Sequence, residues 1–531
     1  MLISEFKLID FGYSSAQMEG VRAPNLLLNG FLDINDICDT VLSGHEFLVL
    51  GYKGSGKSAI AERTRLLHQN NHSLFLQNID LADFPYAAFS KIISDDEAPQ
   101  ARYPAAWSWL LLIYLISSLD RDAAKDIPNI KDFNVTIQAL REIGLLPVMG
   151  LPQLIRTTTE TTLKLSVPPF FEGVQSLGST SVDVPYYVEN IKRLLLNIRT
   201  PNRHLIILDG LDEIVTTQTA QWDSLGSLVY EVNRLNMAFS AAGLNAKVVL
   251  LCRTDIFELL DGANKNKIRQ DSAIELDWYS NPARPEKSRL LSIANLRASI
   301  ALGRKVDVFC EFLPEKSFKR KTTLELLDST RHTPRDFLRL LHFIQISYGG
   351  ESSASSDSNA IRNGLRRYSV EYFMPELIDE LQGYVSSEEA KSFFKLAGAL
   401  RQRDFSLREL LNLADAEGSN LSEDRIRTTL IALFECSGIG NIETDKIGSV
   451  WFQFRYRNRH APFNIRQRML LHRGLWRALN LPLDGSLRSS STISQQPQPS
   501  ASATTGDAES AASRTKPRSR HHAGGRTRKT G

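Results

Sequence analysis

The chain has 531 residues, of which 42% are hydrophobic and 23% charged, as in soluble globular proteins, and it is too long for one small core. Its four cysteines show no CxxC or Cys/His spacing, so neither a disulfide framework nor a zinc site is expected and a reducing compartment is favoured. The first residues lack a basic segment followed by an apolar run, so we expect no signal peptide and a cytoplasmic protein.

Short apolar runs alternate with helical stretches through the first part of the chain. This alternation predicts a parallel α/β sheet, and runs without polar interruption are expected for strands covered on both faces. The predicted strands are residues 46–50, 73–77, 204–208, 247–252 and 273–276.

The long interval between the second and third predicted strands indicates an insertion at about residues 100–190. The run PAAWSWLLLIYLISSL at 104–119 has 16 uncharged residues, fewer than the ~20 that span a bilayer. We therefore predict a buried helix and no membrane contact, with a membrane-inserted helix as the alternative. The segment TTTETTLKLSVPPFFEG, residues 157–173, is predicted to be a β-hairpin.

The segment GYKGSGKS follows the first predicted strand and opens a helix, which is the context required of a GxxxxGK[ST] phosphate-binding loop. In such a loop glycines let backbone N–H groups surround the phosphates, the lysine reaches the β- and γ-phosphates, and the last hydroxyl binds Mg²⁺. ATP is the expected nucleotide. The predicted nucleotide-binding residues are Gly51, Tyr52, Lys53, Gly54, Ser55, Gly56, Lys57 and Ser58, with Ser58 also a metal ligand.

The segment HLIILDGLDE at residues 204–213 is an apolar strand followed by carboxylates. Asp209, at the strand end, is predicted to hold Mg²⁺, and either Asp212 or Glu213 to polarise the attacking water. The carboxyl ends of the strands are where open α/β sheets bind ligands. The alternative is an acidic surface turn.

The pairing of GYKGSGKS with IILDGLDE resembles the STAND/NACHT-related branch of P-loop ATPases, in the additional-strand division that includes AAA+ and initiator ATPases. The resemblance covers about residues 30–345 and implies a parallel sheet of order 5-1-4-3-2. It also implies that Arg253, at the end of the fourth strand, senses the γ-phosphate, and that Lys267 or Arg269 is an arginine-finger-like residue acting in trans. The alternatives are a strand-capping arginine and a basic surface loop.

The segment RHTPRDFLRLL predicts the start of a lid helix after the sheet. Thr333 suits the N-cap position and Pro334 the first helical position. An apolar face follows at helical spacing, formed by Phe337, Leu340, Leu341 and Ile344. Arg335 resembles the sensor-2 arginine of initiator-type ATPases, which binds nucleotide; a plain surface arginine is the alternative.

The later segment predicts a winged-helix-like domain, because SLRELLNLADA and EDRIRTTLIALFECSG are helical, SVWFQFRYR alternates, and IRQRMLLHRGLWRAL is predicted to close as a helix. Seven arginines and no acidic residue lie between Trp451 and Arg477, so this domain either packs on the nucleotide domain or contacts DNA. From Asp484 onward the chain has net charge +5, leaving −2 for the rest, and its composition predicts disorder.

The fold predicted is thus an α/β P-loop NTPase with a helical lid, a C-terminal winged-helix domain and a disordered tail. The predicted domains are residues 1–285, 286–369, 370–482 and 483–531. The favoured hypothesis is an ATP-hydrolysing switch that controls homo-oligomerisation or a protein partner. A DNA-binding motor or loader, and a nucleotide-binding scaffold without turnover, are the alternatives.

Overall fold

The computed structural model describes most of the chain, and the predicted disordered tail lies outside the described residues except for Leu483. The described residues belong to one compact unit that ends at Leu487. They are residues 2–81, 84–93, 99–162, 184–211, 219–260, 264–280, 284–317, 320–348, 357–444 and 449–483.

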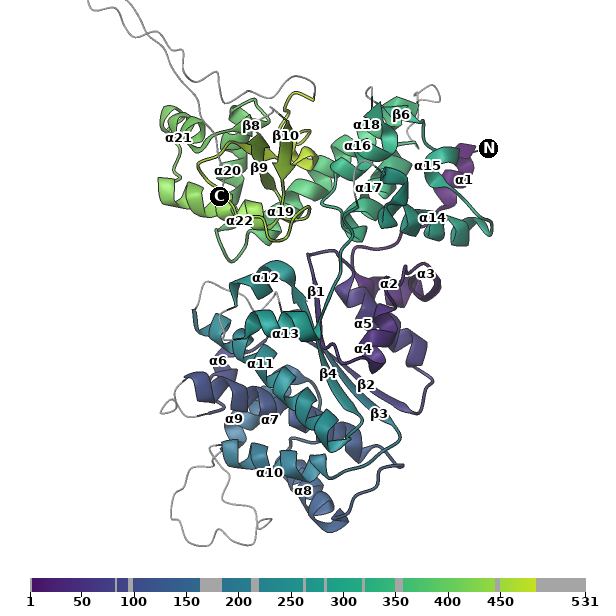
Figure 1. The fold of residues 1–531 in the computed structure, drawn as a ribbon, viewed down its shortest axis with the longest axis vertical. Coiled ribbons are helices and arrows are strands. Elements are labelled where there is room, and N and C mark those ends of the chain that lie inside the picture. Colours follow the sequence, from purple (N-terminus) through teal and green to yellow (C-terminus); the bar gives the residue numbers. More distant parts are fainter. Residues whose placement is uncertain are drawn as a thin grey trace, which may run out of the picture. The chain divides into compact units, whose positions relative to one another are not determined.

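Five parallel strands form the main sheet, in the order β2-β3-β4-β1-β5, which confirms the predicted order 5-1-4-3-2 (Figure 1). The strand leading into the phosphate-binding loop therefore lies between β4 and the edge strand β5, and β4 separates it from β3. All five strands lie where the apolar runs predicted them. Their bounds are β1 Leu48–Gly51, β2 Leu74–Asp80, β3 Arg203–Asp209, β4 Ala246–Arg253 and β5 Ala273–Glu275.

Helices cover both faces of this sheet, and β1, β3 and β4 have buried apolar centres for that reason. In β1, Leu48 and Leu50 belong to one buried cluster and Val49 to another, so alternate side chains enter different layers. One layer contains α2 Ala16–Arg22, α3 Pro24–Asn29, α4 Ile37–Ser43 and α5 Lys57–His68. The other contains α7 Pro99–Asp120, α10 Val184–Leu196 and α11 Thr219–Ala242, with α6 Tyr86–Phe89, α8 Ile130–Glu142, α9 Leu151–Thr162, α12 Thr254–Leu259 and α13 Lys265–Ser272.

The apolar run at 104–119 lies in α7 as predicted, and Trp107 anchors it by donating from Nε1 to the Ser224 carbonyl at 3.0 Å. In the described part of the chain, no helix combines the length and apolar character that crossing a membrane needs. The predicted β-hairpin is wrong for residues 157–162, which continue α9 because Thr158 and Thr159 bond back to carbonyls one turn earlier. Residues 163–173 lie outside the described residues.

The lid is helical and includes the segment 2–11, which we had assigned to the sheet domain. Helix α1 Leu2–Leu8 packs on α14 and α17, and the rings of Phe6 and Phe312 stack with centroids 5.4 Å apart. The other lid elements are η1 Pro285–Lys287, α14 Arg289–Leu302, α15 Val308–Glu311, β6 Lys316–Ser317, β7 Arg320–Lys321, α16 Thr322–Asp328, α17 Pro334–Ser347 and α18 Asp357–Arg367.

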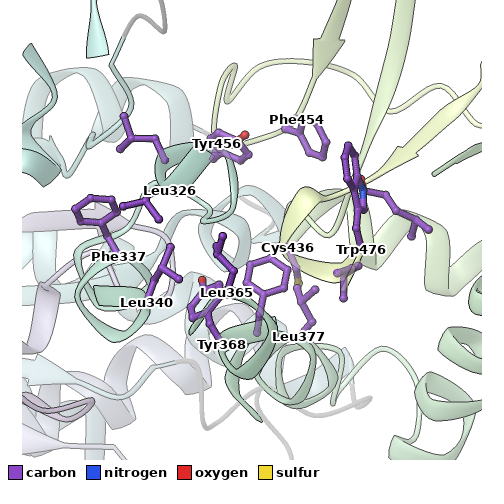
Figure 2. Close-up of a cluster of buried hydrophobic side chains, with 14 of the residues drawn as sticks. Leu326, Phe337, Leu340, Leu365, Tyr368, Leu377, Cys436, Phe454, Tyr456 and Trp476 are labelled. Carbon is purple, nitrogen blue, oxygen red and sulfur yellow. The ribbon is translucent and has the colours of Figure 1, made fainter. Parts of the chain in front are cut away.

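The C-terminal module, residues 374–483, follows a π-helical turn (η2, Tyr368–Phe373) and shares one buried core with the lid. Figure 2 shows side chains of both in this core, among them Leu340 of the lid and Leu377 and Trp476 of the module. Its helices are α19 Met374–Glu380, α20 Ser387–Ala399, α21 Leu407–Ala416 and α22 Glu423–Glu435. Its antiparallel sheet has the order β10-β9-β11-β8, with β8 Asp404–Phe405, β9 Ile439–Thr444, β10 Val450–Gln453 and β11 Met469–Leu471.

The predicted closing helix at IRQRMLLHRGLWRAL is wrong. Residues Met469–Leu471 form β11, which pairs with β9 on one side and β8 on the other, and all three side chains are buried. Only a short 3₁₀ turn, η3 Arg473–Leu475, follows. Tertiary pairing of an apolar triplet outweighs the helical spacing of the residues around it.

Candidate nucleotide-binding site

The loop between β1 and α5 has the backbone that phosphate binding requires. Gly54 and Gly56 have φ of +81° and +103°, which glycine adopts without strain. A Cβ placed on Gly56 meets no atom within 4 Å, so the concave side of the loop is open. The loop and the start of a 12-residue helix thus form a cradle that fits an anion.

Lys57, Ser55 and Ser58 of the loop all line the cavity in front of it. Lys57 is buried, and its Nζ donates to the carbonyls of Gly51 at 3.0 Å and Tyr52 at 3.3 Å. The buried Oγ of Ser55 has no hydrogen-bond partner among the described residues, and its carbonyl accepts from Trp278 Nε1 at 2.8 Å. These groups suit a polyphosphate, which supplies the missing acceptors.

Two carboxylates end neighbouring strands beside the loop. Asp209 ends β3 as predicted, and Asp80 ends β2 as its register partner. Both line the same cavity as Ser58, so this edge can hold Mg²⁺ through one or two carboxylates and a hydroxyl. Asp80 was missed from sequence, although SLFLQNID ends an apolar strand with an aspartate as HLIILD does.

The cavity in front of the loop has a volume of about 320 Å³. Its apolar part, with Leu27, Phe31 and Ile37, is suited to a nucleobase. Arg297 helps to build its wall by an ion pair with Glu19 at 2.7 Å. The segment 11–17, which also lines the cavity, was not predicted to do so, and nothing in its sequence marks it.

Arg335 lies at the P-loop, as the resemblance implied. Thr333 caps α17 by accepting from the Asp336 N–H at 3.3 Å, Pro334 follows, and the predicted apolar face is buried. The Arg335 N–H donates to the Gly54 carbonyl at 3.3 Å, and its guanidinium lines the cavity. The start of the lid helix therefore rests directly on the phosphate loop.

The other predicted catalytic residues are placed less favourably. Arg253 ends β4 but is buried in an ion pair with Asp255 at 2.6 Å and does not line the nucleotide cavity. Arg269, in α13, is ion-paired with Glu275 at 2.7 Å and also with Glu258. Lys267 is exposed on the same helix, and the acidic pair Asp212 and Glu213 lies outside the described residues.

Two P-loop side chains, Tyr52 and Lys53, contact the C-terminal module, and Lys53 also lines the nucleotide cavity. The Tyr52 hydroxyl donates to the Arg455 carbonyl at 3.3 Å, and burial raises its pKa, which keeps it a donor. Lys53 Nζ lies 2.9 Å from Glu376 Oε1 on α19, and Arg335 Nη2 lies 3.4 Å from the same oxygen. The phosphate loop, the lid helix and α19 thus meet at one carboxylate.

The seven arginines of residues 451–477 are mostly committed within the chain. Arg466 is exposed, whereas each of the other six has a carboxylate partner. These pairs are Arg455–Glu435, Arg457–Asp328, Arg459–Glu275, Arg468–Asp404, Arg473–Glu325 and Arg477–Glu325.

Comparison with solved structures gives likenesses at low identity. A Walker-type ATPase of Pyrococcus abyssi aligns over 80% of this chain and 94% of its own, with 10% identity and a TM-score of 0.36. The Aeropyrum pernix ORC1 protein, solved in complex with DNA, aligns over 87% and 96% with 13% identity and a TM-score of 0.36. Cdc6p from Pyrobaculum aerophilum aligns over 84% and 92% with 11% identity and a TM-score of 0.28. No protein-family model and no curated protein matches the chain.

Proposed function

We propose that the protein is a Mg²⁺-dependent ATPase that works as a STAND-like conformational switch. In this switch, ATP binding changes the position of the C-terminal module. The observation that carries this is the contact of Tyr52 and Lys53 with that module. Both residues belong to the loop that encloses the phosphates, so a nucleotide that moves the loop changes these bonds. A ligand shifts a conformational equilibrium only through such differential contacts.

The residues of the cavity have separate roles in the transfer of the γ-phosphate to water. Lys57 leaves the loop carbonyls to reach the β- and γ-phosphates, and Arg335 adds positive charge from the lid. Ser58 and Asp209 would hold Mg²⁺, with Asp80 beside them; the ion neutralises charge on the phosphates. Asp212 or Glu213 is proposed to orient the attacking water.

Six of the seven arginines in residues 451–477 are ion-paired with carboxylates of the chain itself. These pairs favour a C-terminal module that acts on the rest of the chain and not on DNA. Its order of elements, helix α20, strand β8, helices α21 and α22, then the β9–β10 ribbon, supports the winged-helix assignment. Arg459 pairs with Glu275 and donates to the Leu276 carbonyl at 3.0 Å, so it joins the module to the end of β5. We infer that the module reports the state of the nucleotide, with oligomerisation or partner binding as its output.

The test measures the ATP turnover of the full chain and its molecular mass in solution. The mass is compared with ATP, with a non-hydrolysable analogue and without nucleotide. The switch requires that the analogue changes mass or the protease sensitivity of the module, and that turnover falls in Glu213→Gln or Asp212→Asn. An unchanged mass and module in the presence of bound analogue contradicts the switch. A negligible turnover that neither substitution alters shows a scaffold.

DNA binding is the second candidate, and exposed side chains on β10 favour it. Val450 and Trp451 are 49% and 42% exposed at the end of the β9–β10 ribbon, and Arg466 is exposed nearby in sequence. Loss of salt-dependent DNA affinity in Trp451→Ala and Arg466→Ala supports this role. Arg455, Arg457 and Arg459 are unsuitable for this test, because their ion pairs make their loss a structural change.

A further inference from the structure

A second cavity, of about 310 Å³, lies between the lid and the C-terminal module. Lid residues Arg320 in β7 and Asp328 in α16 form one side, and residues of β10, β11 and the turn after it form the other. No described residue lines both this cavity and the nucleotide cavity. Its volume falls within the range of small-molecule sites.

Aromatic side chains form the walls of this cavity. Phe452, Phe454, Tyr456 and Trp476 all line it, and Phe452 is the one that is not fully buried. The rings of Phe454 and Tyr456 stack with centroids 5.5 Å apart, and both rings are visible with Trp476 in Figure 2. The Arg403 and Arg473 guanidinium groups lie over the Trp476 ring, 4.9 and 4.8 Å from its centroid. The partly exposed ring of Phe452 is the surface suited to stack on a nucleobase, which aromatic rings do for every base.

The same cavity carries an excess of positive charge. Arg320, Arg403, Arg457 and Arg473 line it, against the single carboxylate of Asp328. Behind them, Glu325 is fully buried and is shared by three guanidinium groups, those of Arg320, Arg473 and Arg477.

Among the described residues, the arginines that line this cavity outnumber the carboxylates that line it. Guanidinium groups match phosphate geometry, so the arginines at the cavity wall, Arg320 and Arg457 among them, suit a phosphate.

His472 is a buried side chain at the wall of this cavity, 1% exposed. Its Nδ1 accepts from the Gly474 N–H at 3.0 Å, which assigns the ring proton to Nε2. The ring stacks on Phe373 with centroids 4.9 Å apart, and Phe454 and Tyr456 meet it edge to face. His472 therefore fixes the aromatic wall from behind.

We propose that this cavity is a second nucleotide site, distinct from the P-loop, in which the base lies against the aromatic walls and the phosphate against the arginines. The walls belong to both the lid and the C-terminal module, so the occupant holds the two together. The site does not depend on ATP hydrolysis, and its ligand is a free mononucleotide or dinucleotide rather than a polynucleotide strand.

The test measures binding of AMP and GMP to the full chain by calorimetry, in the wild type and in Lys57→Ala. These monophosphates lack the β- and γ-phosphates that Lys57 is expected to reach. The proposal requires saturable binding, at one site per chain, that survives Lys57→Ala. In the wild type, the same probes must bind without displacing ATPγS, which keeps the test valid if Lys57→Ala does not fold.

Two partly exposed lining residues give the decisive variants. Arg320→Ala and Phe452→Ala should each weaken AMP or GMP binding by about ten-fold or more, because each removes a charged contact or a stacking surface. Arg408→Ala, at an exposed arginine of the same module that does not line the cavity, should leave affinity unchanged. Thermal unfolding of each variant verifies that it is folded.

Several outcomes overturn the proposal. One is the absence of binding by either probe up to about 1 mM, an affinity limit near −4 kcal/mol. Another is binding that Arg320→Ala and Phe452→Ala leave intact. Inorganic phosphate that competes as well as AMP would show a simple anion site without base recognition. Binding of an oligonucleotide but of neither monophosphate would assign the surface to a polynucleotide instead.

Discussion

Lys53 Nζ lies 2.9 Å from Glu376 Oε1, so a residue inside the phosphate loop is ion-paired with a helix of the C-terminal module. Arg335 reaches the same oxygen from the lid at 3.4 Å. Burial acts to raise the pKa of Glu376, but Arg335 and Lys53 together hold it below its ordinary value. One charged carboxylate therefore connects the loop, the lid and the module, and it is the natural place to break their coupling.

Glu376→Gln should uncouple the module from the nucleotide while preserving side-chain shape. The neutral amide no longer compensates Lys53 and Arg335, so we expect destabilisation of about 1–3 kcal/mol. Hydrogen exchange of α19 measured with and without ATP analogue should lose its nucleotide dependence. Glu371→Gln breaks the exposed pair with Arg367 and is the control, for which that dependence should persist. Equal behaviour of the two variants contradicts the coupling.

Lys57→Ala should abolish stabilisation by ATP. In the wild type, ATP with Mg²⁺ at about 100 times its dissociation constant raises the free energy of unfolding by about 2.7 kcal/mol, because ligand binds only the folded state. Thermal unfolding with and without ATP measures this difference. A variant that is folded and still gains the full stabilisation shows that the P-loop is not the site.

Asp80→Asn should lower the apparent affinity for Mg²⁺ in the presence of ATP by about ten- to hundred-fold. This is the usual effect of losing a group that supports a metal ligand. The reason is its register position opposite Asp209 at the same sheet edge. A titration with Mg²⁺ at fixed ATP, compared with Asp209→Asn, measures the effect. An exposed aspartate such as Asp132→Asn is the control. If the Mg²⁺ titration of Asp80→Asn matches that of the wild type, Asp80 has no role in Mg²⁺ binding.

His332→Asn should flatten the acid dependence of stability. Burial lowers the pKa of His332 to about 4 from its ordinary 6.5; Asp328 opposes this and Arg457 adds to it. Because the folded-state pKa is depressed, the unfolded chain binds the proton first, and stability falls as pH drops from about 6.5 towards 4. Asparagine tolerates the φ of +54° at this position. Unfolding free energies measured across this window should vary less in the variant, even though loss of the stacked ring lowers them overall.

Glu325→Gln should be the most destabilising of the substitutions considered. Glu325 is fully buried, and its loss leaves Arg473 and Arg477 with uncompensated charge. Removing one partner of a buried pair costs about 3–5 kcal/mol. Asp328→Asn, at a carboxylate that is 22% exposed, should cost less. Chemical denaturation of both variants gives the comparison, and a smaller loss for Glu325→Gln contradicts the expectation.

The sheet could be predicted from sequence because its strands are short apolar runs bounded by polar turns. The phosphate loop, Asp209 and the capped start of α17 at Thr333 and Pro334 carry local signals of the same kind. The order of the strands followed from resemblance, since no local pattern specifies which strands are neighbours. Those predictions of fold are confirmed, whereas the catalytic roles assigned to Arg253 and Arg269 stay predictions.

Long-range partners could not be read in the same way. The ion pair of Arg459 with Glu275 joins residues 184 positions apart, and no local sequence pattern around either residue predicts it. The segment that forms β11 was predicted as a helix because Met469–Leu471 are all apolar and all buried, so no polar alternation marks a strand. The sequence shows which residues are charged or apolar, and the fold decides which of them meet.

The placement of α1 has a consequence for synthesis of the protein. Gln345 Nε2 donates to the carbonyls of Phe6 and Ile9, and Phe6 stacks on Phe312. At translation rates of about 5–20 residues per second, Phe6 leaves the ribosome roughly 15 to 60 seconds before Phe312 is made. During that interval its contacts with α14, α17 and Phe312 cannot form, which makes residues 2–11 a natural place for a chaperone to bind the nascent chain.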